Sequence, residues 1–266
     1  MQFLRSAASN PPGREALSPL CLLLPQTALL ASSVSPLFPR NPTCPSKVGY
    51  AGSQLRESGN TLTSVQFMDI ASPTGSIKLS SIVPILESGD VAGWGDVSVQ
   101  YLNFDGSTDE ENNYMWDGEC WVDTEFNPKG DIDIPAGQGL WVNNAANVAM
   151  AFRSSGAVNL NDIIFDLRDN GNIAAANAFP TKTTLGEILP AIKGTEDVPG
   201  WGDISVQYLN FDGSTDEENN YMWDGEGWVD IEFNPKGDVD IPAAQGLWVN
   251  NASGNPITLR IPAPEL

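Results

Sequence analysis

Two acidic loops carry oxygen-bearing side chains at alternating positions. Residues 103–113 read NFDGSTDEENN, and residues 210–220 repeat them letter for letter. Calcium is bound by about six to eight oxygens from flexible, acidic loops, so this alternation predicts a weak calcium site in each loop. The candidate ligands are Asn103, Asp105, Ser107 and Asp109 in the first loop, and Asn210, Asp212, Ser214 and Asp216 in the second.

The same loops also fit a solvated connection between two strands. When the first loop is laid on the EF-hand pattern, Tyr101 stands where the first aspartate belongs and Asn112 where the bidentate glutamate belongs. The two strongest ligands are therefore missing, and charges in such loops also hinder edge-to-edge aggregation of sheets. We favour the solvated loop and no cofactor, with calcium as the alternative.

Tryptophan is the other residue type that could bind a ligand. Trp94 lies between two glycines, as does its counterpart Trp201, and few neighbours constrain either ring. We expect both to be exposed. Exposed indoles can stack on sugar rings while Asp, Asn and Gln meet the hydroxyl groups, which makes Trp94 and Trp201 candidate carbohydrate-binding residues.

The remaining tryptophans are better explained by packing. Trp116 and Trp121 flank residues 117–119, whose Asp-Gly pair is a strong hairpin signal. We expect the two indoles to stack across this hairpin. Trp141 stands between two aliphatic residues and is expected in the core.

The composition excludes several kinds of catalysis. The chain has no histidine, so Ser-His-Asp and Cys-His mechanisms and imidazole metal sites are absent. Cys120 is replaced by Gly227 in the second copy, so its thiol is no part of a duplicated function, although a disulfide with Cys44 stays open. No pattern singles out a pair of carboxylates as a glycosidase site. We predict that the protein is not an enzyme.

These motifs occur twice because the chain is duplicated. Residues 93–144 recur at 200–251 with five differences, and residues 55–60 match 167–172. We expect a leader or unstructured segment at 1–46, one domain at 47–155 and a second at 156–266, with Gly156 as a hinge. The differing pairs are Val97/Ile204, Cys120/Gly227, Thr124/Ile231, Ile132/Val239 and Gly137/Ala244.

The net charge of −21 narrows the range of binding partners to be expected. Each repeated block holds eleven acidic residues and one lysine, so the blocks account for nearly all of this charge. Nucleic acid and anionic lipid are bound chiefly through Lys and Arg, so neither is an expected partner. A cell-surface protein or a glycan remains as a candidate partner, besides calcium.

The first residues have the order of a secretory signal. Arg5 and Arg14 precede an apolar run at residues 20–30, and small residues follow it. The run is too short and too broken by proline to span a membrane, and no other segment could. We predict export to the cell surface or beyond.

Each copy reads as strands joined by turns. Residues 97–101, 114–116, 121–123 and 140–142 have strand character, with period-2 alternation clearest at 97–101. A short helix could begin at Thr184 and end before Pro190. The sequence therefore predicts a mainly β protein of two tandem duplicated antiparallel domains, each a small sandwich or barrel-like meander with at most a short helix.

Two motifs resemble those of uncharacterised secreted bacterial proteins built of tandem β domains. The motifs are Trp-Asp-Gly-x-x-Trp-Val-Asp at 116–123 and Pro-Ala-Gly-x-Gly-Leu-Trp-Val at 135–142, with Val-Gly-Tyr at 48–50. The resemblance covers about residues 47–266 and implies bacterial export and a surface role. We predict a structural or adhesive protein, with a tandem carbohydrate-binding module or a calcium-binding extracellular module as alternatives.

Overall fold

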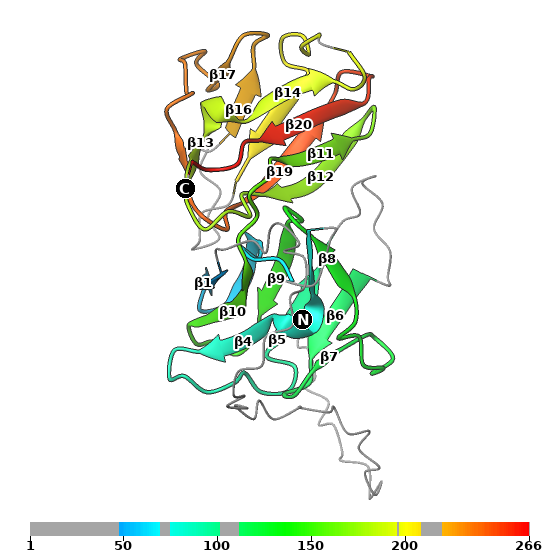
Figure 1. The fold of residues 1–266 in the computed structure, drawn as a ribbon, viewed down its shortest axis with the longest axis vertical. Coiled ribbons are helices and arrows are strands. Elements are labelled where there is room, and N and C mark those ends of the chain that lie inside the picture. Colours follow the sequence, from blue (N-terminus) through cyan, green and yellow to red (C-terminus); the bar gives the residue numbers. More distant parts are fainter. Residues whose placement is uncertain (1–47, 70–74, 102–111, 196, 209–219, 266) are drawn as a thin grey trace, which may run out of the picture. The chain divides into compact units, whose positions relative to one another are not determined.

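The computed structural model describes residues 48–69, 75–101, 112–195, 197–208 and 220–265. Their regular structure is β-strand with short 3-10 turns, among them η1 (Leu79–Ser81) and η3 (Leu185–Glu187). Both repeats lie within one compact unit, Arg40–Leu266. The prediction of two tandem, mainly β copies is confirmed (Figure 1). Residues 1–46 lie outside the described part.

The first copy forms three antiparallel sheets. Their strand orders are β1-β10-β4, β2-β9-β5-β6-β7 and β3-β8. The strands are β1 (Val48–Leu55), β2 (Gly59–Thr63), β3 (Ser76–Lys78), β4 (Val83–Leu86), β5 (Val97–Gln100), β6 (Asn113–Trp116), β7 (Trp121–Val122), β8 (Asp133–Pro135), β9 (Leu140–Asn144) and β10 (Met150–Ala157).

The second copy repeats this topology strand for strand. Its orders are β11-β20-β14, β12-β19-β15-β16-β17 and β13-β18. The strands are β11 (Ile163–Leu167), β12 (Gly171–Ala176), β13 (Thr183–Thr184), β14 (Leu189–Ile192), β15 (Ile204–Gln207), β16 (Asn220–Trp223), β17 (Trp228–Val229), β18 (Asp240–Ile241), β19 (Gly246–Asn251) and β20 (Ile257–Ile261).

Each core lies between the three-stranded and the five-stranded sheet. Trp121 of β7 is fully buried and meets Phe152 of β10 edge-on, with ring centroids 6.0 Å apart. Its indole N–H donates to the carbonyl of Ile82 at 2.8 Å, and Trp228 donates to Ile188 in the same way at 2.7 Å. The indole thus satisfies a buried carbonyl while it fills the space between the sheets.

Most strands predicted from the repeated block are confirmed. Trp116 and Trp121 face each other across the hairpin in an edge-on pair, with centroids 5.3 Å apart. The Asp117 carboxylate accepts the N–H groups of Glu119 and Cys120 and so fixes the turn. The helix expected at Thr184 is the single 3-10 turn η3.

Two expectations are wrong. Gly156 is no hinge, because it lies inside β10, where the backbone of Met68 occupies the place of a side chain. Trp141 is not in the core, because inward and outward positions alternate along β9 and put Leu140 and Val142 inside. The indole of Trp141 is part-exposed on the outer face.

The two copies contact each other reciprocally. Thr63 of the first copy bridges Gln245 of the second, and Gln138 of the first bridges Ala175 of the second. Gln138 and Gln245 are equivalent in the repeat, as are Thr63 and Ala175. Equivalent positions therefore exchange roles, as in an interface with two-fold symmetry.

Two equivalent glycines make this contact possible. A Cβ on Gly139 would lie 2.8 Å from the backbone of Ala174 and Ala175, and one on Gly246 would lie 2.6 Å from the backbone of Leu62. The Gly139 N–H instead donates to the Ala174 carbonyl at 3.0 Å. The second glycine of the Pro-Ala-Gly-x-Gly motif is thus required by the opposite copy.

The Gly137/Ala244 difference has the same origin. A Cβ on Gly137 would lie 2.5 Å from Ile163 and 2.6 Å from Phe165, both of the second copy. At the position equivalent to Phe165 the first copy has only Ser53. Ala244 therefore has its methyl group where the opposite copy presents smaller residues, although its φ of 61° is left-handed.

We predict that Gly139→Ala and Gly246→Ala each destabilise the chain by about 1–3 kcal/mol, because the added methyl overlaps backbone that cannot rotate away. Gly227→Ala is the control. Nothing lies within 4 Å of a Cβ at Gly227, so its change should stay within about 0.5 kcal/mol. Urea unfolding of the three variants measures the difference, and equal midpoints would contradict this account of the interface.

Candidate functional site

An exposed aromatic pair marks each copy. Trp94 is 65% exposed and Phe126 59%, with ring centroids 6.3 Å apart and ring planes within 18°. In the second copy Trp201 and Phe233 are 62% and 58% exposed, with centroids 5.9 Å apart. The expected exposure of Trp94 and Trp201 is confirmed. Contiguous exposed apolar surface is a feature of interaction sites, so each aromatic pair is the candidate site of its copy.

The loop that carries Trp94 is tied to the sheet below it. It connects β4 to β5, and the Gly95 N–H donates to the Trp116 carbonyl at 2.8 Å. The Asp96 carboxylate accepts the Gly93 N–H at 2.6 Å. Gly202, Asp203 and Gly200 repeat these bonds around Trp201. The backbone on both sides of each indole is fixed while the ring itself projects outward.

A second tight loop carries Phe126, between β7 and β8. The Asp123 carboxylate accepts the N–H groups of Glu125 and Asn127, each at 2.9 Å, and the Phe126 N–H donates to the Asp123 carbonyl at 3.0 Å. Lys129 makes an ion pair with the same carboxylate at 3.4 Å. Asp230 organises the loop of Phe233 in the same way.

These hydrogen bonds lower the pKa of both aspartates. The backbone N–H of Asn234 is the largest cause at Asp230, assisted by the Asn234 amide, Lys236 and the Glu232 N–H, and the pKa falls to about 2. At Asp123 the pKa is lowered in the same way, first by the Asn127 N–H. Both loops are therefore held by carboxylates that stay ionised well into the acid range.

Phe126 and Phe233 have left-handed backbone conformations, with φ of 65° and 64°. Such a conformation costs a residue with a Cβ about 1–2 kcal/mol, and Gly or Asn would adopt it more easily. Neither ring is buried, so core packing does not account for the strain. Strain of this kind gathers at functional sites.

The other sites expected from the sequence have separate outcomes. The candidate calcium ligands in residues 103–109 and 210–216 lie outside the described residues, so calcium binding stays a prediction. Within the described part, no group of three or more acidic or cysteine side chains is arranged to hold a metal ion. The Cys120 thiol donates to the Asp117 carboxylate at 3.6 Å, and Cys44 lies outside the described residues.

No protein-family model matches the sequence, and none of the curated proteins matches it either. No helix in the described ranges is long and apolar enough to cross a membrane. The site must therefore be judged by its own geometry.

Phe126 and Phe233 are the site residues that sequence reasoning missed. Each follows a glutamate and precedes the turn Asn-Pro-Lys-Gly, where a large apolar residue is unusual. That placement was the available signal. No signal in the sequence pointed to the stacking partner, because Trp94 and Phe126 are brought together only by the way β6 and β7 pair.

We predict that Phe126→Asn with Phe233→Asn changes the free energy of unfolding by less than about 1 kcal/mol. Relief of left-handed strain offsets the lost ring contact, because asparagine tolerates this conformation. Phe152→Ala is the control, since truncating a buried phenylalanine costs about 3–5 kcal/mol. Denaturant unfolding tests both. A loss in the double Asn variant as large as in the control would show that these rings stabilise the fold.

We predict that Asp123→Asn with Asp230→Asn lowers the melting temperature at pH 5 and that this difference closes between about pH 4 and pH 2. In the folded chain the pKa of both carboxylates lies below the ordinary value of about 3.9. Their contribution to stability is therefore fully present above about pH 3.9 and is lost as the pH falls through the folded pKa. Thermal melts across this range check it. Asp131→Asn with Asp238→Asn matches the charge change at two exposed positions, and an identical pH profile for that control would contradict the prediction.

Proposed function

We propose that this chain is a non-enzymatic, exported binding protein that acts in adhesion at the cell surface or outside the cell, and that its ligand is carbohydrate. The observation that carries the proposal is the exposed Trp–Phe pair held on fixed loops in each copy. The basic, apolar and small segments in residues 1–46 support export.

The chemistry of these pairs suits a sugar ring. The C–H groups on one face of a pyranose form an apolar surface that packs on an indole or phenyl face. With a net charge of −21, the chain repels acidic glycans, so neutral or amino sugars are the expected class. The strain kept at Phe126 and Phe233 supports a binding role, because asparagine there would relax the backbone but lose the aromatic surface.

Duplication supports adhesion rather than capture of single small molecules. Two sites on one chain convert the second binding event into an intramolecular one, which raises avidity by about 10²–10⁴-fold without a new contact. A repetitive glycan on a surface offers such paired sites. A soluble monosaccharide does not, so the duplication would bring no gain for it.

The test is a glycan array with the full chain, covering neutral, amino and acidic glycans. We expect binding to a neutral or amino glycan that is sharply reduced in Trp94→Ala and in Trp201→Ala, because one site loses the avidity gain, and reduced further in the double variant, which keeps neither exposed pair. Val91→Ala/Val198→Ala changes exposed, non-aromatic residues in the same two loops and should bind normally. Glycan binding unaffected by the tryptophan double variant would refute the proposal. So would hydrolase activity abolished by one carboxylate substitution.

A further inference from the structure

The five-stranded sheets carry no charge in a strongly acidic protein. None of the residues in β2, β5, β6, β7 and β9, or in β12, β15, β16, β17 and β19, is Asp, Glu, Lys or Arg. Their outer faces carry amides, serine, methionine and one tryptophan per copy. Amide pairs on this face bond to each other, Asn143 to Asn60 at 2.9 Å and Asn250 to Asn172 at 2.7 Å.

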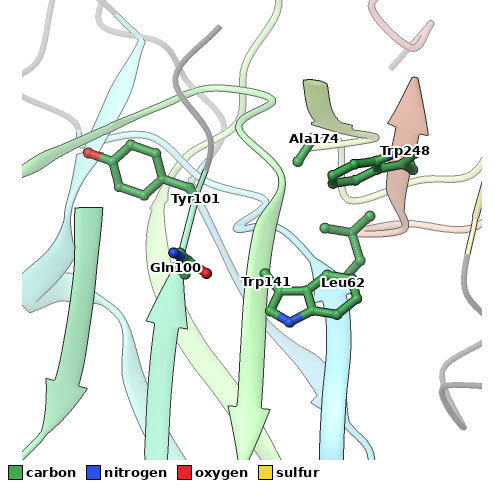
Figure 2. Close-up of a pocket in the computed structure, with 6 residues that line it drawn as sticks. All are labelled: Leu62, Gln100, Tyr101, Trp141, Ala174 and Trp248. Carbon is green, nitrogen blue, oxygen red and sulfur yellow. The ribbon is translucent and has the colours of Figure 1, made fainter. Parts of the chain in front are cut away.

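A cleft between the copies opens from these faces. It has a volume of about 210 Å³, and an adjoining hollow of about 180 Å³ shares its walls. Its lining residues are Leu62, Gln100, Tyr101 and Trp141 of the first copy and Ala174 and Trp248 of the second, and Figure 2 shows Leu62 between the two indoles. Gln207 lines the adjoining hollow.

The lining follows from strand register. On the first copy Leu62, Trp141 and Gln100 stand directly opposite one another on β2, β9 and β5. On the second, Ala174, Trp248 and Gln207 form the equivalent row on β12, β19 and β15. Each copy therefore supplies an aliphatic residue, an indole and an amide, and the reciprocal glycine contact makes the two rows share one space.

The rows differ at one position that enlarges the cleft. Ala174 stands where the first copy has Leu62, so the second row lacks three carbon atoms beside Trp248. Both indoles are only part-buried, so each leaves ring surface available to the cleft. The volume lies below the range of about 300–1,000 Å³ typical of drug-sized ligands, which limits the occupant to about one ring.

We propose that this cleft is a second carbohydrate site, formed jointly by both copies, that takes one ring of a neutral sugar. Two indoles offer apolar faces, and the Gln100 and Gln207 amides offer both donors and acceptors to hydroxyl groups. Among the described residues that line the cleft none carries a charged side chain, so a charged sugar would leave its charge without a partner there. The proposal shares only its ligand class with the exposed aromatic pairs and uses none of their residues.

Stoichiometry separates this site from the exposed pairs. The cleft gives one site per chain and involves Trp141 and Trp248, whereas the exposed pairs give two sites and involve Trp94 and Trp201. Trp94→Ala/Trp201→Ala removes the exposed pairs and serves as the background for the test. If no sugar binds in the cleft in this background, the proposal for the exposed pairs still stands or falls by the array. If the array refutes the exposed pairs, the titration of the cleft still tests the second site.

The experiment titrates the ¹⁵N-tryptophan-labelled full chain, in that background, with cellohexaose, maltohexaose, mannohexaose and chitohexaose, and with a galacturonic acid hexamer as charged control. We expect at least one neutral hexaose to shift the indole N–H signals of Trp141 and Trp248 together at one equivalent per chain. The charged hexamer should shift neither. No joint shift with any neutral hexaose would overturn the proposal.

Two further variants test the geometry. Ala174→Leu copies the side chain that the first copy has at this position, fills the cleft and should abolish the joint shift. Gln100→Ala/Gln207→Ala keeps the indoles and should weaken binding about tenfold or more, because each lost amide removes a hydrogen bond to the sugar. Their folding is checked by unchanged strand spectra and signals from Trp121 and Trp228. Undiminished binding in both folded variants would also overturn the proposal.

Discussion

The absence of a side chain at Gly139 and Gly246 is the constraint on which the arrangement of the two copies depends. Because each glycine lets its strand approach the backbone of the other copy, Thr63, Gln138 and Gln245 become buried. The edge strands β2 and β12 also meet the opposite copy. Exposed sheet edges invite aggregation, and here each copy covers part of the other's edge.

Charge and aromatic surface are divided between loops and strands. The strands of the five-stranded sheets hold no ionised side chain, while carboxylates such as Asp117 and Asp123 organise the turns between them. A carboxylate in a turn satisfies several N–H groups at once and stays in contact with water. The same arrangement leaves the outer faces of the sheets uncharged, although the net charge of the chain is strongly negative.

The repeated block was predictable because its signals are local. Alternation in β5, the Asp-Gly turn and the flanking tryptophans specify a hairpin without reference to the rest of the chain. Trp141 was misplaced because both faces of β9 carry apolar residues, and only pairing with β2 and β5 shows which face is inside. Gly156 was misread because a glycine pressed against Met68 resembles a flexible one in sequence. The inter-copy cleft had no local signal at all.

Near-identity between the two blocks does not make them interchangeable. Gly137 faces Ile163 and Phe165 of the opposite copy, so the alanine that stands at 244 would not fit there. The reverse replacement places only a smaller residue at 244, in a backbone conformation that glycine accepts readily. If the blocks exchange sequence by gene conversion, the first can overwrite the second at this position, but transfer in the other direction is selected against. Gene conversion can therefore make the two copies alike at this position only when the first copy is the donor.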